Sequence, residues 1–234
     1  MTNEGKTEQD AILQIDNWSS WHDEYANSDS ELNARKRAVQ NQVAAIVEQC
    51  PPGPVTVVSI CGGQGRELIG AVENHARRAD VRGRIVELDP ENSAFARAWA
   101  RKAGLDNLEV VTGDASLSAS FAGLPPVDIV VISGVFGHID VADQKLLVSF
   151  LRQICRKGGY VVWTFFSRGE ERTNSLRGIF REQEFVEESF ETLSGKFGFT
   201  IARSCYAGTT VPFELDSKFF TFGSSRAGRQ EAES

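Results

Sequence analysis

The sequence predicts an α/β fold, a doubly wound and mostly parallel β-sheet with helices on both faces. From residue 55 onward, short runs rich in β-branched residues alternate with amphipathic helical patterns. This alternation is typical of a parallel sheet that is covered on both sides. The chain has 234 residues, of which 41% are hydrophobic, enough for one such domain with a sizeable core.

Charge and hydropathy exclude several classes of partner. The 25 Lys and Arg against 32 Asp and Glu give a formal net charge of −7, which argues against a general nucleic-acid coat, because phosphate binding depends on clustered positive charge. No apolar run approaches the length of a membrane span, and the opening MTNEGKTEQD lacks the basic and apolar regions of a signal peptide. We therefore expect a cytoplasmic protein that binds neither nucleic acid nor membranes.

The cysteine pattern predicts neither a metal site nor disulfides. Cysteine occurs at four separated positions, 50, 61, 155 and 205, with no C-x-x-C pair. That spacing excludes a zinc ribbon and leaves no disulfide framework.

The N-terminal region predicts two helices. Apolar residues recur at helical spacing between Ala11 and Cys50, with an interruption at residues 27–30. Ser30 is the expected N-cap of the second helix, and the proline-rich residues 51–54 end it. We assign residues 1–50 to an N-terminal helical cap or lid, 51–226 to the sheet domain, and 227–234 to a disordered tail.

The sheet domain begins with five strands in regular alternation with helices. Strands are expected over residues 55–60, 84–88, 108–111, 128–132 and 160–165, with helices over 68–79, 91–103 and 144–155. After Ser167 the chain reads as helical and charged through Gly195. Phe199–Ser204 and Lys218–Phe222 are expected to form two further strands, joined by a loop short enough for antiparallel pairing.

Polar residues follow four of these strands, at the edge where open parallel sheets bind ligands. The first strand runs into a glycine cluster, residues 59–67, whose backbone can approach a ligand closely. Glu87 lies 22 residues after Gly65, the distance at which an acid accepts hydrogen bonds from ribose hydroxyls. Asp114 follows the third strand, and residues 133–138 follow the fourth.

Five segments carry a resemblance to a known family: ICGGQGRE, IVELDPENSAFARAWARKAGL, VVTGDAS, DIVVISGVFG and RKGGYVVWTF. In these segments the chain resembles the class I S-adenosylmethionine-dependent methyltransferases, and the resemblance extends over roughly residues 30–223. The resemblance implies a Rossmann-like, seven-stranded sheet with a reversed last strand, and S-adenosyl-L-methionine as cofactor. The implied cofactor-binding residues are Ser59, Cys61, Gly62, Gly63, Gly65, Glu67, Glu87, Leu88, Asp114, Ala115, Ser133 and Gly134. Among them, residues 61–65 would face the methionine part, Glu87 the ribose, and Asp114 with Ala115 the adenine.

The chain departs from that family at several positions. Ser59 stands where an acid is frequent and Cys61 where a glycine is frequent, so Glu67 is a candidate to supply the missing carboxylate. The run GVFGHID with the late FFTF is also similar to a group of bacterial methyltransferase-like proteins, which suggests secondary metabolism. Within that group His138 replaces an Asn, and Phe165 with Phe166 replaces a basic pair, which predicts an altered acceptor pocket.

The acceptor would be covered by segments outside the core sheet. Trp18, Trp21, His22 and Tyr25 share one helical face, which suits either packing on the sheet or a lid over the ligand. His138 is the candidate general base, because imidazole titrates near neutrality, and His22 is the alternative. The expected acceptor-binding residues are Trp18, Trp21, Tyr25, Phe136, Phe165 and Arg168.

These features predict methyl transfer to O or N of a small, aromatic or planar metabolite. A methyltransferase-like protein that binds cofactor or a partner without turnover is the alternative. An aminopropyltransferase and a nicotinamide enzyme rank lower; Gly63-Gln64-Gly65 lacks the third glycine of the nicotinamide motif. The sequence does not decide whether the chain forms a homodimer.

Overall fold

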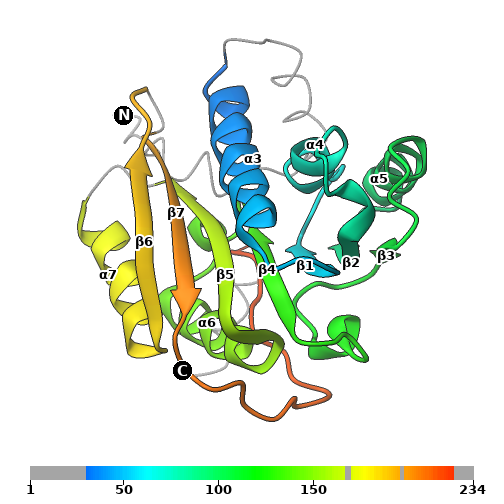
Figure 1. Ribbon diagram of the computed structural model, residues 1–234. Coiled ribbons are helices and arrows are strands. Elements are labelled where there is room, and N and C mark those ends of the chain that lie inside the picture. The colour runs from blue at the N-terminus through cyan, green and yellow to red at the C-terminus, as the bar shows by residue number, and fades with distance from the viewer. Residues whose placement is uncertain (1–29, 167–169, 196–197, 224–234) are drawn as a thin grey trace, which may run out of the picture.

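A computed structural model describes residues 30–166, 170–195 and 198–223. Its centre is a seven-stranded sheet in the order β3-β2-β1-β4-β5-β7-β6 (Figure 1). The strands are β1 Val55–Ile60, β2 Val81–Glu87, β3 Leu108–Thr112, β4 Val127–Ile132, β5 Cys155–Phe166, β6 Phe185–Thr192 and β7 Phe199–Tyr206. The first five pair in parallel, whereas β7 is antiparallel to both β5 and β6. The expected Rossmann-like sheet with a reversed last strand is therefore confirmed.

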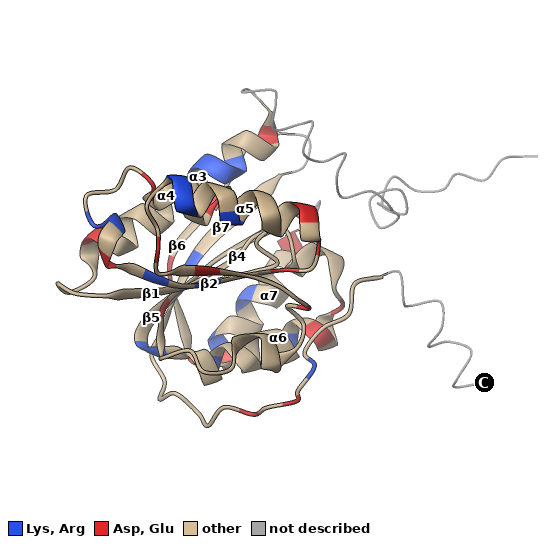
Figure 2. Cartoon of the chain, turned by 90° about the vertical axis from the view of Figure 1, so that its right-hand side faces the viewer, with Lys and Arg blue, Asp and Glu red and all other residues tan. Residues whose placement is uncertain are grey.

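Helices cover both faces of the sheet, as Figure 2 shows. The α-helices are α3 Glu31–Gln49, α4 Leu68–Val72, α5 Pro90–Lys102, α6 Val141–Ile154 and α7 Glu170–Glu182. Helices α3, α4 and α5 lie on one face, and α6 and α7 on the other (Figures 1 and 2). Alternate residues of β1 enter the two cores: Val55 and Val57 join the cluster under α3–α5, and Val58 and Ile60 join the cluster under α6 and α7.

Helix α3 begins where the sequence predicts. Ser30 is its N-cap, and the Ser30 hydroxyl accepts a hydrogen bond from the Asn33 backbone N–H at 3.2 Å. The helix buries Val39, Val43 and Ile46 in the same cluster as the sheet residues. The described part of the expected cap is thus a layer of the core, while the domain boundary at residue 50 stays a prediction.

Of the last two expected strands, Phe199–Ser204 is confirmed as part of β7, whereas the strand expected at residues 218–222 is absent and its place at the sheet edge is taken by β6. The charged stretch expected to be helical to Gly195 is helix α7 only to Glu182, because Glu184 has a left-handed φ of 65° and the chain then turns into β6. Strand β6 is at the edge of the sheet and is exposed at most of its positions, so its charges resemble those of a solvated helix face. Residues 218–222 form no strand; Lys218 makes a single antiparallel bridge to Leu117.

Other boundaries differ by a few residues. The helix expected over 68–79 ends at Val72 and is followed by a 3-10 turn at Arg78–Asp80. Strand β5 begins at Cys155 instead of residue 160. All four cysteines are free thiols. Among the residues that the structure describes, no helix is both long and apolar enough to cross a bilayer.

Candidate functional site

A cavity of about 590 Å³ opens at the carboxyl ends of the parallel strands, a volume typical of small-molecule sites. Its walls come from the loops after β1, β2, β3 and β4, from the end of β5, from helix α3, and from the C-terminal segment. The lining residues are Arg35, Cys61, Gly62, Gly63, Gln64, Arg66, Glu67, Glu87, Leu88, Asp89, Pro90, Asn92, Asp114, Ala115, Ser116, Ser133, Gly134, Val135, His138, Phe166, Lys218, Phe220, Thr221 and Phe222.

The loop after β1 is shaped by left-handed residues. Cys61, Gly63 and Gly65 have φ values of 52°, 54° and 76°, a region that glycine enters without the clash of a β-carbon. A β-carbon on Gly65 would collide with Ile69, whereas one on Gly63 would meet nothing within 4 Å. The loop therefore packs tightly against Ile69 at Gly65 and exposes backbone without a side chain to the cavity at Gly63. A ligand can approach the backbone closely at that point.

Glu87 lies at the end of β2, next to this loop. One of its carboxylate oxygens accepts a hydrogen bond from the Gly63 N–H at 2.8 Å, and the other accepts one from the Asp89 N–H at 2.9 Å. A carboxylate can accept about four hydrogen bonds, so two acceptor positions are left. That number matches the two hydroxyls of a ribose.

Two further acids, Asp89 after β2 and Asp114 after β3, are held by backbone N–H groups of the turns that follow them. Asp89 is the N-cap of α5 and accepts hydrogen bonds from the N–H groups of Glu91 and Asn92. Asp114 accepts one from the Ser116 N–H at 2.8 Å. Both carboxylates thus stabilise the turns that form the cavity wall.

The loop after β4 is fixed by residues from β5 and α6. The Thr164 hydroxyl accepts a hydrogen bond from the Gly134 N–H at 2.9 Å, and the Gln144 amide donates to the Phe136 carbonyl at 2.9 Å. Gln144 is buried, where its hydrogen bonds fix a single arrangement. Ser133, Gly134 and His138 are held in place at the cavity by these contacts.

His138 lies in the 3-10 turn Phe136–His138 and is only 8% exposed. Its ring centroid is 5.4 Å from that of Phe166, the last residue of β5. Burial, with a smaller contribution from the Arg35 charge, lowers the pKa of His138 from its usual 6.5 to about 4. His138 is therefore a neutral imidazole at neutral pH.

The C-terminal segment forms the remaining wall. The Phe219 N–H donates to the Ser116 carbonyl at 3.0 Å, and the Thr221 N–H donates to the Asp143 carboxylate at 2.9 Å. These two contacts tie residues 219–221 to the loop after β3 and to the start of α6. The segment expected to be a strand is thus one side of the cavity, lined by Phe220, Thr221 and Phe222.

The structure gathers ten of the twelve predicted cofactor residues at this cavity, and their role in binding stays a prediction. The ten are Cys61, Gly62, Gly63, Glu67, Glu87, Leu88, Asp114, Ala115, Ser133 and Gly134. Ser59 is buried in β1, beneath the loop, and Gly65 packs on Ile69. Those two positions shape the loop without lining the cavity.

The prediction of the acceptor-binding residues is less successful than that of the cofactor-binding residues. Phe136 and Phe165 do not line the cavity, because both are buried in the core on the α7 side; Phe136 packs edge-on against Trp163 and Phe180. Phe166 lines the cavity instead. Trp18, Trp21, His22, Tyr25 and Arg168 lie outside the described residues.

Sequence reasoning missed Arg35, Arg66, Phe166 and the C-terminal wall. Arg35 belongs to the basic run Arg35-Lys36-Arg37 of α3, and a helix pattern alone does not show which of three adjacent cations turns inward. Phe219, Phe220 and Phe222 are interrupted only by Thr221, so the sequence does not show which of the three rings faces a ligand.

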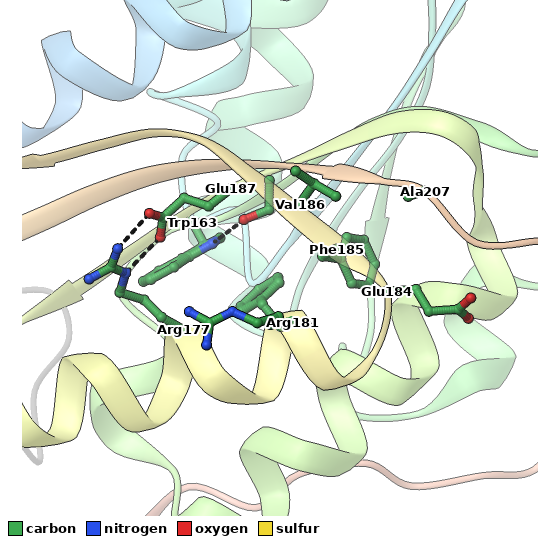
Figure 3. Close-up of a pocket in the computed structure, with 10 residues that line it drawn as sticks. Trp163, Arg177, Arg181, Glu184, Phe185, Val186, Glu187 and Ala207 are labelled. Carbon is green, nitrogen blue, oxygen red and sulfur yellow. Dashed lines mark hydrogen bonds and ion pairs between the residues drawn. The ribbon is translucent and has the colours of Figure 1, made fainter.

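A second cavity, of about 520 Å³, lies between α7 and β6, away from the strand ends (Figure 3). Four of its polar side chains are paired: Arg177 makes two 2.7 Å contacts with Glu187, and the Trp163 indole N–H donates to the Ser204 hydroxyl at 3.2 Å. We assign it no chemistry. Within the described ranges, no cluster of His, Cys, Asp and Glu side chains is suited to a metal ion.

Comparisons with known proteins bear on the family and on the fold. Residues 61–163 match the family model described as a methyltransferase domain. The magnesium protoporphyrin IX methyltransferase of Synechocystis PCC 6803, solved with bound S-adenosylmethionine, is similar with a TM-score of 0.61 and 16% identity, over 87% of this chain and 99% of that one. No curated protein matches the chain in sequence.

Two further structures share the fold. The precorrin-6y C5,15-methyltransferase of Geobacter metallireducens GS-15 has a TM-score of 0.55 and 15% identity, over 71% of this chain and 87% of that one. An O-methyltransferase family 2 protein of Planctomyces limnophilus DSM 3776, in complex with apigenin, has a TM-score of 0.52 and 17% identity, over 73% of this chain and 61% of that one. At such identities these likenesses establish the fold alone.

Proposed function

We propose that this chain, whose residues 61–163 match a methyltransferase domain, is a class I S-adenosylmethionine-dependent methyltransferase. It would methylate O or N of a small, flat metabolite bound beside His138 and Phe166. S-adenosylmethionine, when bound, supplies an electrophilic methyl group on a sulfonium sulfur. Glu87, Asp114 and the loop of residues 61–65 are the groups that would hold the cofactor.

The observation that supports a flat acceptor is the aromatic wall of the cavity. Phe166 lines it from the end of β5, and Phe220 and Phe222, whose ring centroids are 5.2 Å apart, line it from the C-terminal segment. Aromatic rings bind a planar partner through stacked or edge-on contacts. The structural neighbours named for protoporphyrin or holding apigenin also concern flat ring systems.

The lowered pKa of His138 bears on the kind of acceptor. Moving a proton from a phenol of pKa about 10 to an imidazole of pKa about 4 would require about 8 kcal/mol. An acceptor that is already deprotonated, or a neutral amine with a free lone pair, avoids that step. We therefore propose that His138 orients the acceptor and that catalysis depends mainly on proximity.

Product formation from methyl-labelled S-adenosylmethionine and a metabolite extract, followed by mass spectrometry, tests the proposal. Once a product identifies the acceptor, His138→Asn should raise KM more than it lowers kcat. His75→Asn is the matched control, because the half-buried His75 contacts the exposed Glu48 and does not line the cavity.

Two results would contradict this proposal. A fall in kcat of roughly 10²–10⁴-fold in His138→Asn would make His138 a general base instead. The absence of a methylated product from every extract would favour the alternative of a protein that binds cofactor without turnover.

A further inference from the structure

Three rings line the end of the cavity that lies beside β4 and β5. They belong to His138 after β4, to Phe166 at the end of β5, and to Phe222 of the C-terminal segment. The ring centroids of His138 and Phe166 are 5.4 Å apart. Gly223, the residue after Phe222, lies beside the same turn, because a β-carbon on Gly223 would stand 3.8 Å from the His138 carbonyl oxygen. Together His138, Phe166 and Phe222 form the aromatic end of the cavity.

Most of the acidic side chains in the cavity wall lie away from the aromatic end. Glu87 and Asp89 are at the end of β2, and Asp114 follows β3, whereas β4 and β5 lie on the other side of β1. The remaining acid among the described lining residues, Glu67, forms an ion pair with Arg35 at 3.3 Å. The two charges of this pair offset each other. A ligand at the aromatic end is therefore in contact mainly with rings.

The rings of the aromatic end favour a positively charged ligand over a negatively charged one. The face of an aromatic ring carries partial negative charge, so it attracts a cation and repels an anion. Burial lowers the pKa of His138 to about 4, so its imidazole is uncharged at neutral pH and does not repel a cation. A positive charge that develops beside Phe166 and Phe222 is thus stabilised without any proton transfer.

Methyl transfer to an uncharged ring nitrogen creates such a charge. The lone pair of the nitrogen forms the new nitrogen–carbon bond, the carbon–sulfur bond breaks, and its electron pair stays on sulfur. Sulfur becomes a neutral thioether, the ring nitrogen becomes positive, and no proton leaves. A phenolate would instead bring a negative charge against the ring faces. An alkylamine, which is protonated at neutral pH like the Lys ammonium of pKa about 10.4, would first have to lose a proton.

We propose that the acceptor is an uncharged aromatic heterocycle and that the methyl group goes to a ring nitrogen, which gives a permanently positive N-methyl product. The inference rests on the proposed methyl transfer and names its acceptor class. The aromatic end binds the acceptor more strongly as the positive charge develops, and interactions that strengthen in the transition state are those that accelerate a reaction. Phe166 and Phe222 thus select for this class of acceptor.

The charge of the product tests the inference directly. The full chain is incubated with methyl-labelled S-adenosylmethionine and a metabolite extract, and labelled products are applied to a cation exchanger at neutral and at strongly alkaline pH. A quaternary N-methyl product should be retained at both, because it has no proton to lose. A labelled ether or alkylamine that is not retained at alkaline pH would overturn the inference and leave the proposed function intact. The absence of a labelled product from every extract would contradict the proposed function itself.

Two probes of the same shape test the aromatic end without turnover. N-methylquinolinium is a flat cation, and the methylnaphthalene of the same shape is its uncharged counterpart. With S-adenosylhomocysteine bound, the wild type should bind the cation roughly 2- to 30-fold more tightly than the uncharged probe, the range for a cation on aromatic faces. This preference should fall in Phe166→Leu and in Phe222→Leu. Phe190→Leu is the matched control and should keep it, since Phe190 packs on Arg177 and does not line the cavity.

The variants should remain folded, because Phe166 and Phe222 are only partly buried and leucine keeps an apolar side chain at each position. Thermal unfolding of each variant checks this before the probes are compared. Absence of a preference for the cation in the wild type would overturn the inference. A preference that survives both substitutions would also overturn it, because charged residues would then be its source.

Discussion

Phe166 packs its ring against Gly137, over the place that a β-carbon on Gly137 would take. The same ring lies next to His138. A glycine at position 137 therefore lets an aromatic side chain from β5 reach the imidazole, and this pair forms the part of the cavity nearest to β4 and β5.

We predict that Gly137→Ala displaces the Phe166 ring and destabilises the protein by about 1–3 kcal/mol, the usual cost of overpacking. The NMR signals of the His138 imidazole should shift, because a neighbouring ring moves. With only three histidines in the chain, His138 can be assigned by its loss in His138→Asn. Gly178→Ala in α7 is the control: a β-carbon there meets nothing within 4 Å, so that variant should be slightly more stable. An unshifted His138 signal in Gly137→Ala would contradict the prediction.

The pKa of His138 predicts how stability changes with pH. Its folded-state pKa of about 4 lies below the usual 6.5, so the unfolded chain binds the proton more readily. The contribution of neutral His138 to the free energy of unfolding is therefore fully present above pH 6.5. It falls by up to about 3 kcal/mol as the pH is lowered toward 4. Urea unfolding of the wild type and of His138→Asn across this range measures the difference. A constant difference between the two proteins from pH 7 to pH 4 would disprove the lowered pKa.

The strand ends could be predicted from the sequence because their chemistry is local. Glu87 ends one β-branched run and Asp114 lies two residues after another, and the parallel order brings them to one edge. Arg35 and Phe222 are different, since both enter the cavity from segments whose position depends on tertiary packing. Arg35 lies 32 residues from its partner Glu67, and no spacing rule connects them.

The aromatic residues at the end of β5 show a second limit. Trp163 and Phe165 have the same strand parity and both enter the core on the α7 side, which leaves Phe166 for the cavity. The sequence shows two adjacent phenylalanines but does not show which face of the strand carries the ligand. Strand β6 was missed for a related reason: an exposed edge strand lacks the apolar alternation that identifies a half-buried one.

We predict that Glu87→Ala weakens S-adenosylhomocysteine binding by about 1–3 kcal/mol, the usual loss for hydrogen bonds to a charged group. Glu87 also accepts hydrogen bonds from Gly63 and Asp89, so part of the loss would come from a looser loop. Calorimetry measures the change, and Glu109→Ala is the control, because Glu109 forms an exposed ion pair with Arg84 outside the cavity. Unchanged affinity in a folded Glu87→Ala protein would exclude the ribose role.

The aromatic face of residues 18–25 is tested by truncation. Deletion of residues 1–28 leaves Ser30, the N-cap of α3, and every buried residue of that helix in place, so the core should stay folded. If Trp18, Trp21 and Tyr25 cover the acceptor, the truncated protein should bind S-adenosylhomocysteine normally and lose turnover, because a cover excludes water and completes the acceptor pocket.

A substitution series makes this test independent of chain length. Three single substitutions are made in the full chain: Trp18→Ala, Trp21→Ala and Tyr25→Ala. Each should raise KM for the acceptor and leave the affinity for the cofactor unchanged. Ser20→Ala is the control within the same segment, since position 20 falls on the side opposite the predicted aromatic face at helical spacing. Wild-type turnover by the truncated protein would exclude a covering role and leave those aromatic residues with packing alone.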